Sequence, residues 1–239
     1  SKQGATNNVD LRVINKDVHV VVSNRTLSTL DYWIFPEENL FNYFKTNTSD
    51  PFSEDVMHHH LKANMNVYGV CMGIVDGKPY AALTEEEGPT IQLWDLTSKQ
   101  VINTLDITAD ETNVPKSGNE AEGCVFDDEN KHLLISREGE RGYLKAFKSD
   151  TLEMIKVVDS RDGNITGDPE GVAIYATSEN DGYIILSSQG GNEFNLYDRQ
   201  NLTFIEKFKI NGVEDTDGLD VTNNQVKGIF PNGFLVVQD

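Results

Sequence analysis

The sequence predicts an all-β fold, a β-propeller made of four-stranded antiparallel blades. Short runs rich in β-branched and aromatic residues alternate along the chain with turns rich in Gly, Asn and Asp, as in consecutive hairpins. A polar residue followed by glycine recurs with a period of roughly fifty residues, a length typical of one propeller repeat. Each such dipeptide is therefore predicted to open a blade.

The unit that begins at Asp168 shows this pattern most clearly. Two acidic residues flank Pro169, and Gly171 follows them at the mouth of a strand. Predicted strands cover residues 172–175, 183–188, 194–197 and 204–210, and the turn at 179–182 consists of Glu, Asn, Asp and Gly. These four strands make one complete blade.

The other units repeat the pattern within a single domain, residues 1–239. A first unit has strands at 11–14, 18–22 and 32–35, a second covers 67–107, a third covers 121–158, and a fifth begins at 216 with a later strand at 234–237. We predict that residues 36–65 are mainly a long surface connection, with a weak helical pattern at 53–60.

The composition limits the classes of partner. The chain has 239 residues and a formal net charge of −19, from 39 acidic residues against 20 Lys and Arg. This charge opposes binding to nucleic acid or anionic membrane, so neither is expected as a partner, and it favours a protein that collects cations. The alternative is that the acidic surface only keeps a secreted protein soluble. No apolar run approaches the roughly 18 residues that a membrane span needs.

Cysteine and histidine carry weaker signals. Cys71 and Cys124 lie in apolar contexts and are predicted to be buried packing residues, with a disulfide between them left open. His58, His59 and His60 fall in the predicted connection. Three adjacent rings in a loop cannot all face one ion, so a transition-metal site is not expected there.

The repeated blade openings predict one acidic site. Equivalent positions of a propeller line the same end of its channel, so openings that are distant in sequence should meet there. The residues gathered in this way are Glu122, Asp168, Glu170, Gln189, Asp217 and Asp220. Their ligand atoms are all oxygen, which suits a hard cation such as Ca²⁺, whereas zinc would require His or Cys. The alternative for any one of these acids is that it caps a turn and meets solvent.

Several segments resemble the signature segments of the β-propeller phytases, in the same order. They are NEAEGCVFDDENKHLLIS, DPEGVAIY, GYIILSSQGG, LYDRQ, DTDGLDV and GFLVVQD, and VDLRV, VVVSNR and VYGV resemble the family's earlier blades. The similarity covers nearly the whole chain. It implies an alkaline, calcium-dependent bacterial phytase: a secreted six-bladed propeller that hydrolyses phosphomonoesters of phytate, or of its less phosphorylated intermediates, by metal-activated water.

The resemblance also assigns roles to residues. The family's calcium ligands, which hold several ions, match Glu122, Asp168, Glu170, Gln189 and Asp217. Its catalytic set matches Glu122, Glu170, Arg25 and Tyr68. Contacts with phytate, or with the phosphate that it releases, are expected from Arg25, Tyr68, Arg137 and Gln189.

The chain departs from the family in three ways. Nothing matches the family's first segment, and the strand that normally follows its terminal QD and closes the ring is missing. Glu86 stands where relatives often carry a phosphate-binding lysine. Arg137 stands where the family tends to have an acidic ligand, although Glu138 could serve after a shift of one residue.

These departures leave other functions open. We expect a shortened or incomplete, perhaps unclosed, propeller, with low activity alone or a preference for less phosphorylated inositols. A second phytase domain or self-association could cover its exposed strand edges. The main alternative is a non-catalytic propeller that binds calcium and phosphate and supports a catalytic partner domain. A weaker alternative is another calcium-dependent propeller enzyme, such as a sugar lactonase.

Overall fold

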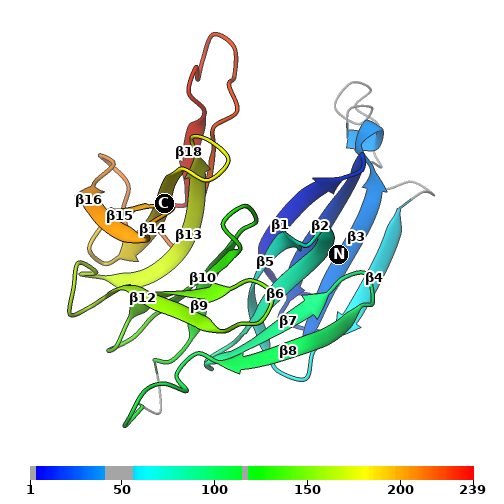
Figure 1. Cartoon of the computed structure of the whole chain (residues 1–239), viewed down its shortest axis with the longest axis horizontal. Coiled ribbons are helices and arrows are strands. Elements are labelled where there is room, and N and C mark those ends of the chain that lie inside the picture. The colour runs from blue at the N-terminus through cyan, green and yellow to red at the C-terminus, as the bar shows by residue number, and fades with distance from the viewer. Residues whose placement is uncertain (1–3, 41–55, 115–117) are drawn as a thin grey trace.

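The computed structural model describes residues 4–40, 56–114 and 118–239, and within these ranges the chain is built almost entirely of strands (Figure 1). The first blade consists of β1 (Thr6–Ile14), β2 (Asp17–Asn24), β3 (Thr29–Pro36) and β4 (Met57–Lys62). The second consists of β5 (Val67–Val75), β6 (Lys78–Glu85), β7 (Thr90–Asp95) and β8 (Gln100–Asp106).

The later units follow the same order. The third blade consists of β9 (Ala121–Asp127), β10 (His132–Arg137), β11 (Tyr143–Lys148) and β12 (Met154–Ser160). The fourth consists of β13 (Asp168–Ala176), β14 (Gly182–Gln189), β15 (Glu193–Asp198) and β16 (Thr203–Phe208). A two-stranded sheet of β17 (Leu219–Thr222) and β18 (Phe234–Val237) ends the described chain. Every pairing is antiparallel between consecutive strands, so the predicted all-β propeller of four-stranded blades is confirmed.

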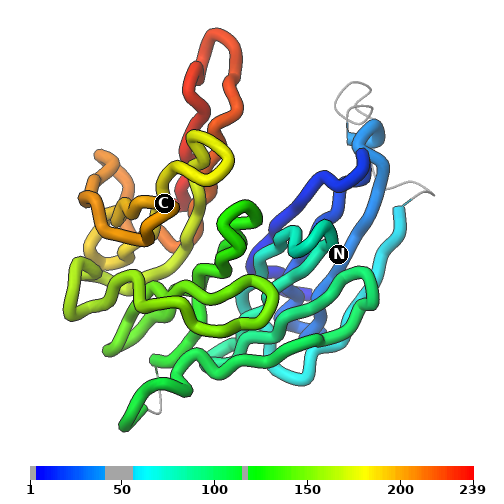
Figure 2. The backbone as a smooth tube through the Cα atoms, viewed as in Figure 1, coloured from blue at the N-terminus to red at the C-terminus, as the bar shows by residue number. Residues whose placement is uncertain are grey.

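The blades stand side by side in an arc, and the first strand of each unit lies on its inner side (Figures 1 and 2). Strand β1 contacts β5, β5 contacts β9, β9 contacts β13, and β13 contacts β17. Apolar cores fill the spaces between consecutive blades. Between the first two, for example, Leu30 and Tyr32 pack in one cluster with Met72 and Leu83.

The repeated glycines are the points of closest contact between neighbouring inner strands. A Cβ added to Gly69 would lie 2.6 Å from the carbonyl oxygen of Glu122, the second residue of the next inner strand. The same holds for Gly123 against Glu170, at 2.5 Å, and for Gly171 against Asp217, at 2.5 Å. A residue with a side chain would not fit these approaches, so glycine permits the blades to pack at this distance.

One face of the first blade has no neighbouring blade among the described residues. Strand alternation points Val9, Leu11 and Val13 away from β5, and these side chains are 65%, 48% and 49% exposed. Asp10 points the other way, and its Oδ2 accepts a hydrogen bond from the N–H of Met72 on β5 at 2.8 Å. The arc of blades therefore leaves an apolar sheet face uncovered.

The segment after β3 differs from the prediction. Residues 57–62 form β4, the outer strand of the first blade, and are neither a surface connection nor part of a helix. Polar residues at most of these positions hide the alternation that usually identifies a strand, and pairing with β3 determines the structure instead. Residues 41–55 of the predicted connection, including the part of the predicted helix at 53–55, lie outside the described residues.

The two cysteines are joined. Cys71 on β5 and Cys124 on β9 form a disulfide, which was left open by the sequence. Cys71 is buried, as predicted, and Cys124 is partly buried. The reason is topological: β5 and β9 are neighbouring inner strands, and this adjacency brings together two residues that are 53 positions apart.

We predict that Gly123→Ala lowers the free energy of unfolding by about 1–3 kcal/mol, because its Cβ would clash with the Glu170 carbonyl of the next blade. Gly218→Ala is the matched control. It holds the same repeat position, but its Cβ would meet only the Gln238 side chain at 3.5 Å. Urea unfolding measures the difference, and equal stability of the two variants would contradict the packing role of the repeat.

Candidate functional site

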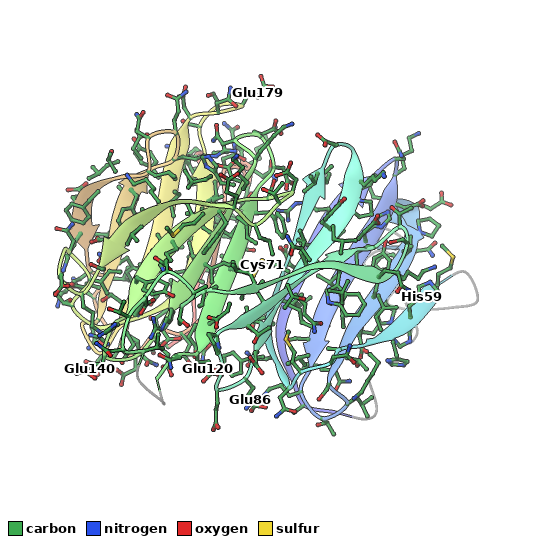
Figure 3. All side chains as sticks on the ribbon, turned by 60° about the horizontal axis from the view of Figure 1, so that its bottom comes forward. His59, Cys71, Glu86, Glu120, Glu140 and Glu179 are labelled. Carbon is green, nitrogen blue, oxygen red and sulfur yellow. A yellow bond between two sulfur atoms is a disulfide. The ribbon has the colours of Figure 1, made fainter. Side chains whose placement is uncertain are left out.

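The inner strands carry the predicted acids to one end of the arc. Glu122 is the second residue of β9, Asp168 and Glu170 open β13, and Asp217 lies just before β17. These strands are consecutive neighbours and begin at the same end, so their first residues meet there. In Figure 3, Glu86 and Glu120 lie at this end, opposite Glu179.

Three carboxylates form the densest part of the site. Oxygen atoms of Glu120, Glu122 and Glu138 lie within 4.8 Å of one another. Glu120 immediately precedes β9 and Glu138 immediately follows β10, and the Glu138 N–H donates to the Glu120 carbonyl at 3.2 Å. The carboxyl group of Glu122 also shares a hydrogen bond with that of Glu170. Both members of this pair are buried, at 8% and 6% exposure, whereas Glu120 and Glu138 are partly buried. These four residues form an acidic cluster at one end of the arc.

Burial and mutual repulsion raise the pKa values of the glutamates in this cluster. Burial, followed by the charge of Glu170, raises the pKa of Glu122 far above its usual range. Burial and the nearby Glu138 raise the pKa of Glu170 as well. The pKa values of Glu120 and Glu138 are also raised, chiefly by burial. Arg25 and Arg161 lower the pKa values of Glu120 and Glu138, but burial outweighs their effect, so the cluster can accept further positive charge.

Arg25 and Tyr68 lie at the edge of the acidic cluster. The Arg25 guanidinium sits over the Tyr68 ring, 5.0 Å from its centroid, and forms an ion pair with Glu86. Burial, followed by the charge of Glu122, raises the pKa of Tyr68, so its hydroxyl stays protonated at neutral pH. Arg25, for which phosphate binding is predicted, therefore lies beside the cluster and is paired with the acidic side chain of Glu86.

Asp168, Gln189 and Asp217 surround the acidic cluster and already have partners. Asp168 forms an ion pair with Arg161, and its Oδ1 accepts the Gly139 N–H at 3.1 Å. The Gln189 amide donates to the Asp217 carboxylate. Asp217 also raises the pKa of Glu170, which places its charge close to the buried pair.

The structure separates Arg137 and Asp220 from the acidic cluster. Arg137 has 0% exposure, and its guanidinium binds Glu111 at 2.7 Å and Asn119. A phosphate could contact the Arg137 guanidinium only if its hydrogen bond with Glu111 or with Asn119 were broken. The next residue, Glu138, points into the cluster instead. Asp220 and Asp10 line another cavity on the inner face of the arc, and neither of them lines the cavity that contains Glu122.

Glu120 was not predicted to be a metal ligand, although its spacing from Glu122 in the sequence indicates that it can be one. It lies two residues before Glu122, and residues two apart on an extended chain share a face. The acidic string NEAEG therefore contained two ligand candidates.

The donor set fits a hard divalent cation. A cavity of about 210 Å³ at this end is lined by Tyr68, Glu122 and Asp217 together with Asn7, Asn8 and Gln238. The side chains that line it offer oxygen, with some amide nitrogen, and no His or Cys contributes among the described residues. Two carboxylates line this cavity, and the other members of the acidic cluster lie beside Glu122. Carboxylate oxygens are the ligands that Ca²⁺ prefers.

Comparisons with known proteins identify relatives of the chain. The family model described as Phytase matches residues 2–239. The 3-phytase of Bacillus subtilis (strain 168) is 35% identical over 132 residues, or 52% of this chain and 35% of that protein. The matched part thus spans about a third of that relative.

Two solved structures share the fold. A putative 6-phosphogluconolactonase from Bacteroides fragilis NCTC 9343 superposes with a TM-score of 0.57 at 14% identity, covering 88% of this chain and 55% of that one. The WD40 repeats of RRP9 superpose with a TM-score of 0.57 at 11% identity, covering 91% and 55%. At these identities the likeness concerns the fold alone.

We expect the thermal stability of the metal-free protein to fall as the pH rises from about 6 to about 9. The folded state raises the pKa values of Glu122 and Glu170, so it favours their protonated forms. The stability that these groups contribute is fully present below the ordinary Glu pKa of about 4.3 and is lost as the pH rises through the raised values. Calorimetry in excess chelator measures the effect.

Two controls accompany this pH series. Glu122→Gln should flatten the loss of stability, because it removes the group with the larger rise in pKa. Adding calcium at the alkaline end should restore stability in the unsubstituted protein. A melting temperature that stays constant over the range without metal would contradict the electrostatic account.

Proposed function

This chain belongs to the phytase family, whose model covers residues 2–239, and on that premise we propose that it hydrolyses phosphomonoesters of phytate or of less phosphorylated inositol phosphates. The observation that carries the proposal is the convergence of four buried or partly buried carboxylates beside Arg25. Glu120, Glu122, Glu138 and Glu170 meet at one end of the arc of blades. Carboxylates can hold cations and an arginine can bind phosphate, so the arrangement supplies groups for both tasks.

Calcium, in several sites, is the proposed metal. Its ligands would be Glu122, Asp168, Glu170, Gln189 and Asp217, and the geometry adds Glu120 and Glu138. Phytate is a dense polyanion and the chain carries a net charge of −19, so direct association would be repulsive. Bound calcium would offset this repulsion and lower the pKa of a coordinated water, which is the nucleophile expected in such a site.

The protein's own groups would position the substrate. Arg25 would exchange its ion pair with Glu86 for a bidentate pair with a phosphate. The Tyr68 ring supports the guanidinium, and its protonated hydroxyl can donate a hydrogen bond to a phosphate oxygen. Gln189 would orient Asp217 through the hydrogen bond between them.

A second candidate function rests on two observations. Glu86 forms an ion pair with Arg25, the proposed phosphate-binding residue. The first blade also leaves the apolar face around Val9, Leu11 and Val13 uncovered. Both would be expected of a propeller that binds calcium and phosphate weakly and pairs with a second phytase domain or with another copy of itself. Phytate hydrolysis by the isolated chain separates the two candidates, because only the first predicts turnover without a partner.

The disulfide supports an extracellular location. Bonds such as Cys71–Cys124 persist in oxidising compartments and are rare in the cytosol. We therefore propose that the protein is secreted, as in the bacterial relatives that its sequence resembles. Within the described residues, no helix has the length and apolar character needed to cross a membrane.

Phosphate release from phytate should stop in excess chelator and return when calcium is added. Glu122→Gln should lower kcat/KM at least about 10-fold, since even groups that only orient a metal ligand contribute that much. Glu153→Gln is the control, because this exposed carboxylate pairs with Lys148 on the outer side of the third blade. Turnover that persists in chelator would remove the proposed mechanism.

Glu86→Gln should lower KM for inositol phosphates by up to about 5-fold with little change in kcat. The substitution frees Arg25 from a partly exposed ion pair, and such pairs contribute up to about 1 kcal/mol. Glu87→Gln removes the same charge at an exposed neighbouring position that has no ion pair with Arg25. If KM is unchanged or higher in Glu86→Gln alone, Glu86 does not compete with the substrate.

A further inference from the structure

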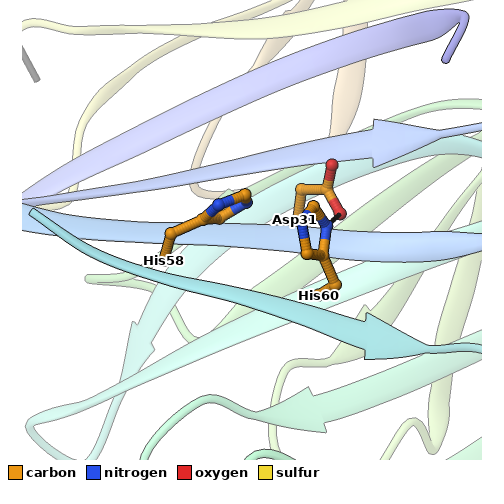
Figure 4. Close-up of side chains that lie close together, drawn as sticks. All are labelled: Asp31, His58 and His60. Carbon is orange, nitrogen blue, oxygen red and sulfur yellow. Dashed lines mark hydrogen bonds and ion pairs between the residues drawn. The ribbon is translucent and has the colours of Figure 1, made fainter. Parts of the chain in front are cut away.

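A second group of possible metal ligands lies on the outer half of the first blade, away from the acidic cluster. Asp31 on β3 is directly opposite His60 on β4, and Trp33 is opposite His58. Residues two apart on a strand share a face, so His58 and His60 lie on the same side of the sheet as Asp31 (Figure 4). The assignment of these histidines to a loop concealed this arrangement.

The three side chains are close enough to share one ion. One ligand atom from each of Asp31, His58 and His60 lies within 4.8 Å of the others. His60 Nδ1 and Asp31 Oδ1 are 2.7 Å apart, and the centroids of the two imidazole rings are 4.1 Å apart. Ligand atoms of a tetrahedral zinc site are about 3.3 Å apart, given bonds of roughly 2.0–2.1 Å. Asp31 and His60 are already closer than this, so small shifts of the side chains would bring the three ligand atoms to the spacing of such a site.

The surrounding residues hold the ligands in place. The Asp31 side chain is fully buried, and Thr29 Oγ1 donates to it at 2.7 Å and Asn24 Nδ2 at 3.1 Å. The His58 ring stacks on the Trp33 indole, with centroids 4.4 Å apart and planes inclined by 8°. Fixed ligands of this kind reduce the entropy that metal binding costs. The site therefore has a buried carboxylate and a His58 ring supported by Trp33, while the exposed His60 ring can adjust.

We propose that Asp31, His58 and His60 bind a divalent transition-metal ion, with Zn²⁺ as the best fit. Two imidazole nitrogens and one carboxylate oxygen form a ligand set that suits zinc. The acidic cluster, by contrast, offers mainly oxygen and suits calcium. The two sites thus select different metals by the chemistry of their ligands.

Metal binding would change one existing contact of these side chains. His60 Nδ1 would exchange its hydrogen bond with Asp31 Oδ1 for a bond to the metal. The buried Asp31 side chain would supply the oxygen ligand beside it.

The ion would stabilise the outer edge of the first blade by linking β4 to β3. Strand β4 pairs with β3 on one side only and forms the outer edge of its sheet. A metal held by Asp31 on β3 and by two histidines on β4 would tie this edge strand to its neighbour. Because both histidines are exposed, a fourth coordination position would face solvent.

Zinc titration of the full chain in saturating calcium, which fills the acidic cluster, tests the proposal. We expect one zinc ion per chain, a rise in melting temperature on zinc binding, and a visible absorption spectrum of tetrahedral character when Co²⁺ replaces zinc. His58→Gln and His60→Gln should each weaken zinc affinity at least about 10-fold. Both positions are exposed, so the variants should fold, and circular dichroism checks this.

His59→Gln is the matched control. His59 lies on the same strand but points to the other face, where its ring is 6.2 Å from that of Tyr32. It should bind zinc as the unsubstituted protein does. Equal zinc affinity in the His58→Gln and His60→Gln variants, equal weakening in His59→Gln, or no stoichiometric zinc binding would each overturn the proposal.

Discussion

The close approach of glycine to the next blade is the constraint on which the rest of the structure depends. Gly69, Gly123 and Gly171 each leave room for the backbone carbonyl of an acidic residue in the following unit. These contacts set the distance between inner strands at one end of the arc. Each repeat therefore fixes both the packing of two blades and the position of one carboxylate, and the convergence of charge follows from the packing.

This packing carries an electrostatic cost that explains the chemistry of the site. Glu122 and Glu170 are buried side by side and share a hydrogen bond, although both would be charged in water. Arg25 and Arg161 relieve only part of the repulsion, because each forms its ion pair with a carboxylate outside the cluster, Glu86 or Asp168. A folded chain that gathers acids in this way must bind either protons or cations.

The sequence predicted most of the fold and part of the site. Alternation of apolar residues and turns identified nearly all the strands, and the repeat placed Glu122, Glu170 and Asp217 together. Strand β4 was missed because its histidines give no apolar alternation, and only pairing with β3 makes it a strand. The orientation of Arg137 and Glu138 depends on where β10 ends, which a sequence pattern does not define to one residue. The disulfide depends on the distance between two inner strands, which becomes known only when the blades are assembled.

A crystal structure of the chain with calcium and inorganic phosphate would test the central claim most directly. The account predicts calcium ions bound among the carboxylates of Glu120, Glu122, Glu138 and Glu170, and a phosphate bound to Arg25 in place of Glu86. Carboxylates that remain without an ion at saturating calcium, with Arg25 still paired to Glu86, would contradict it.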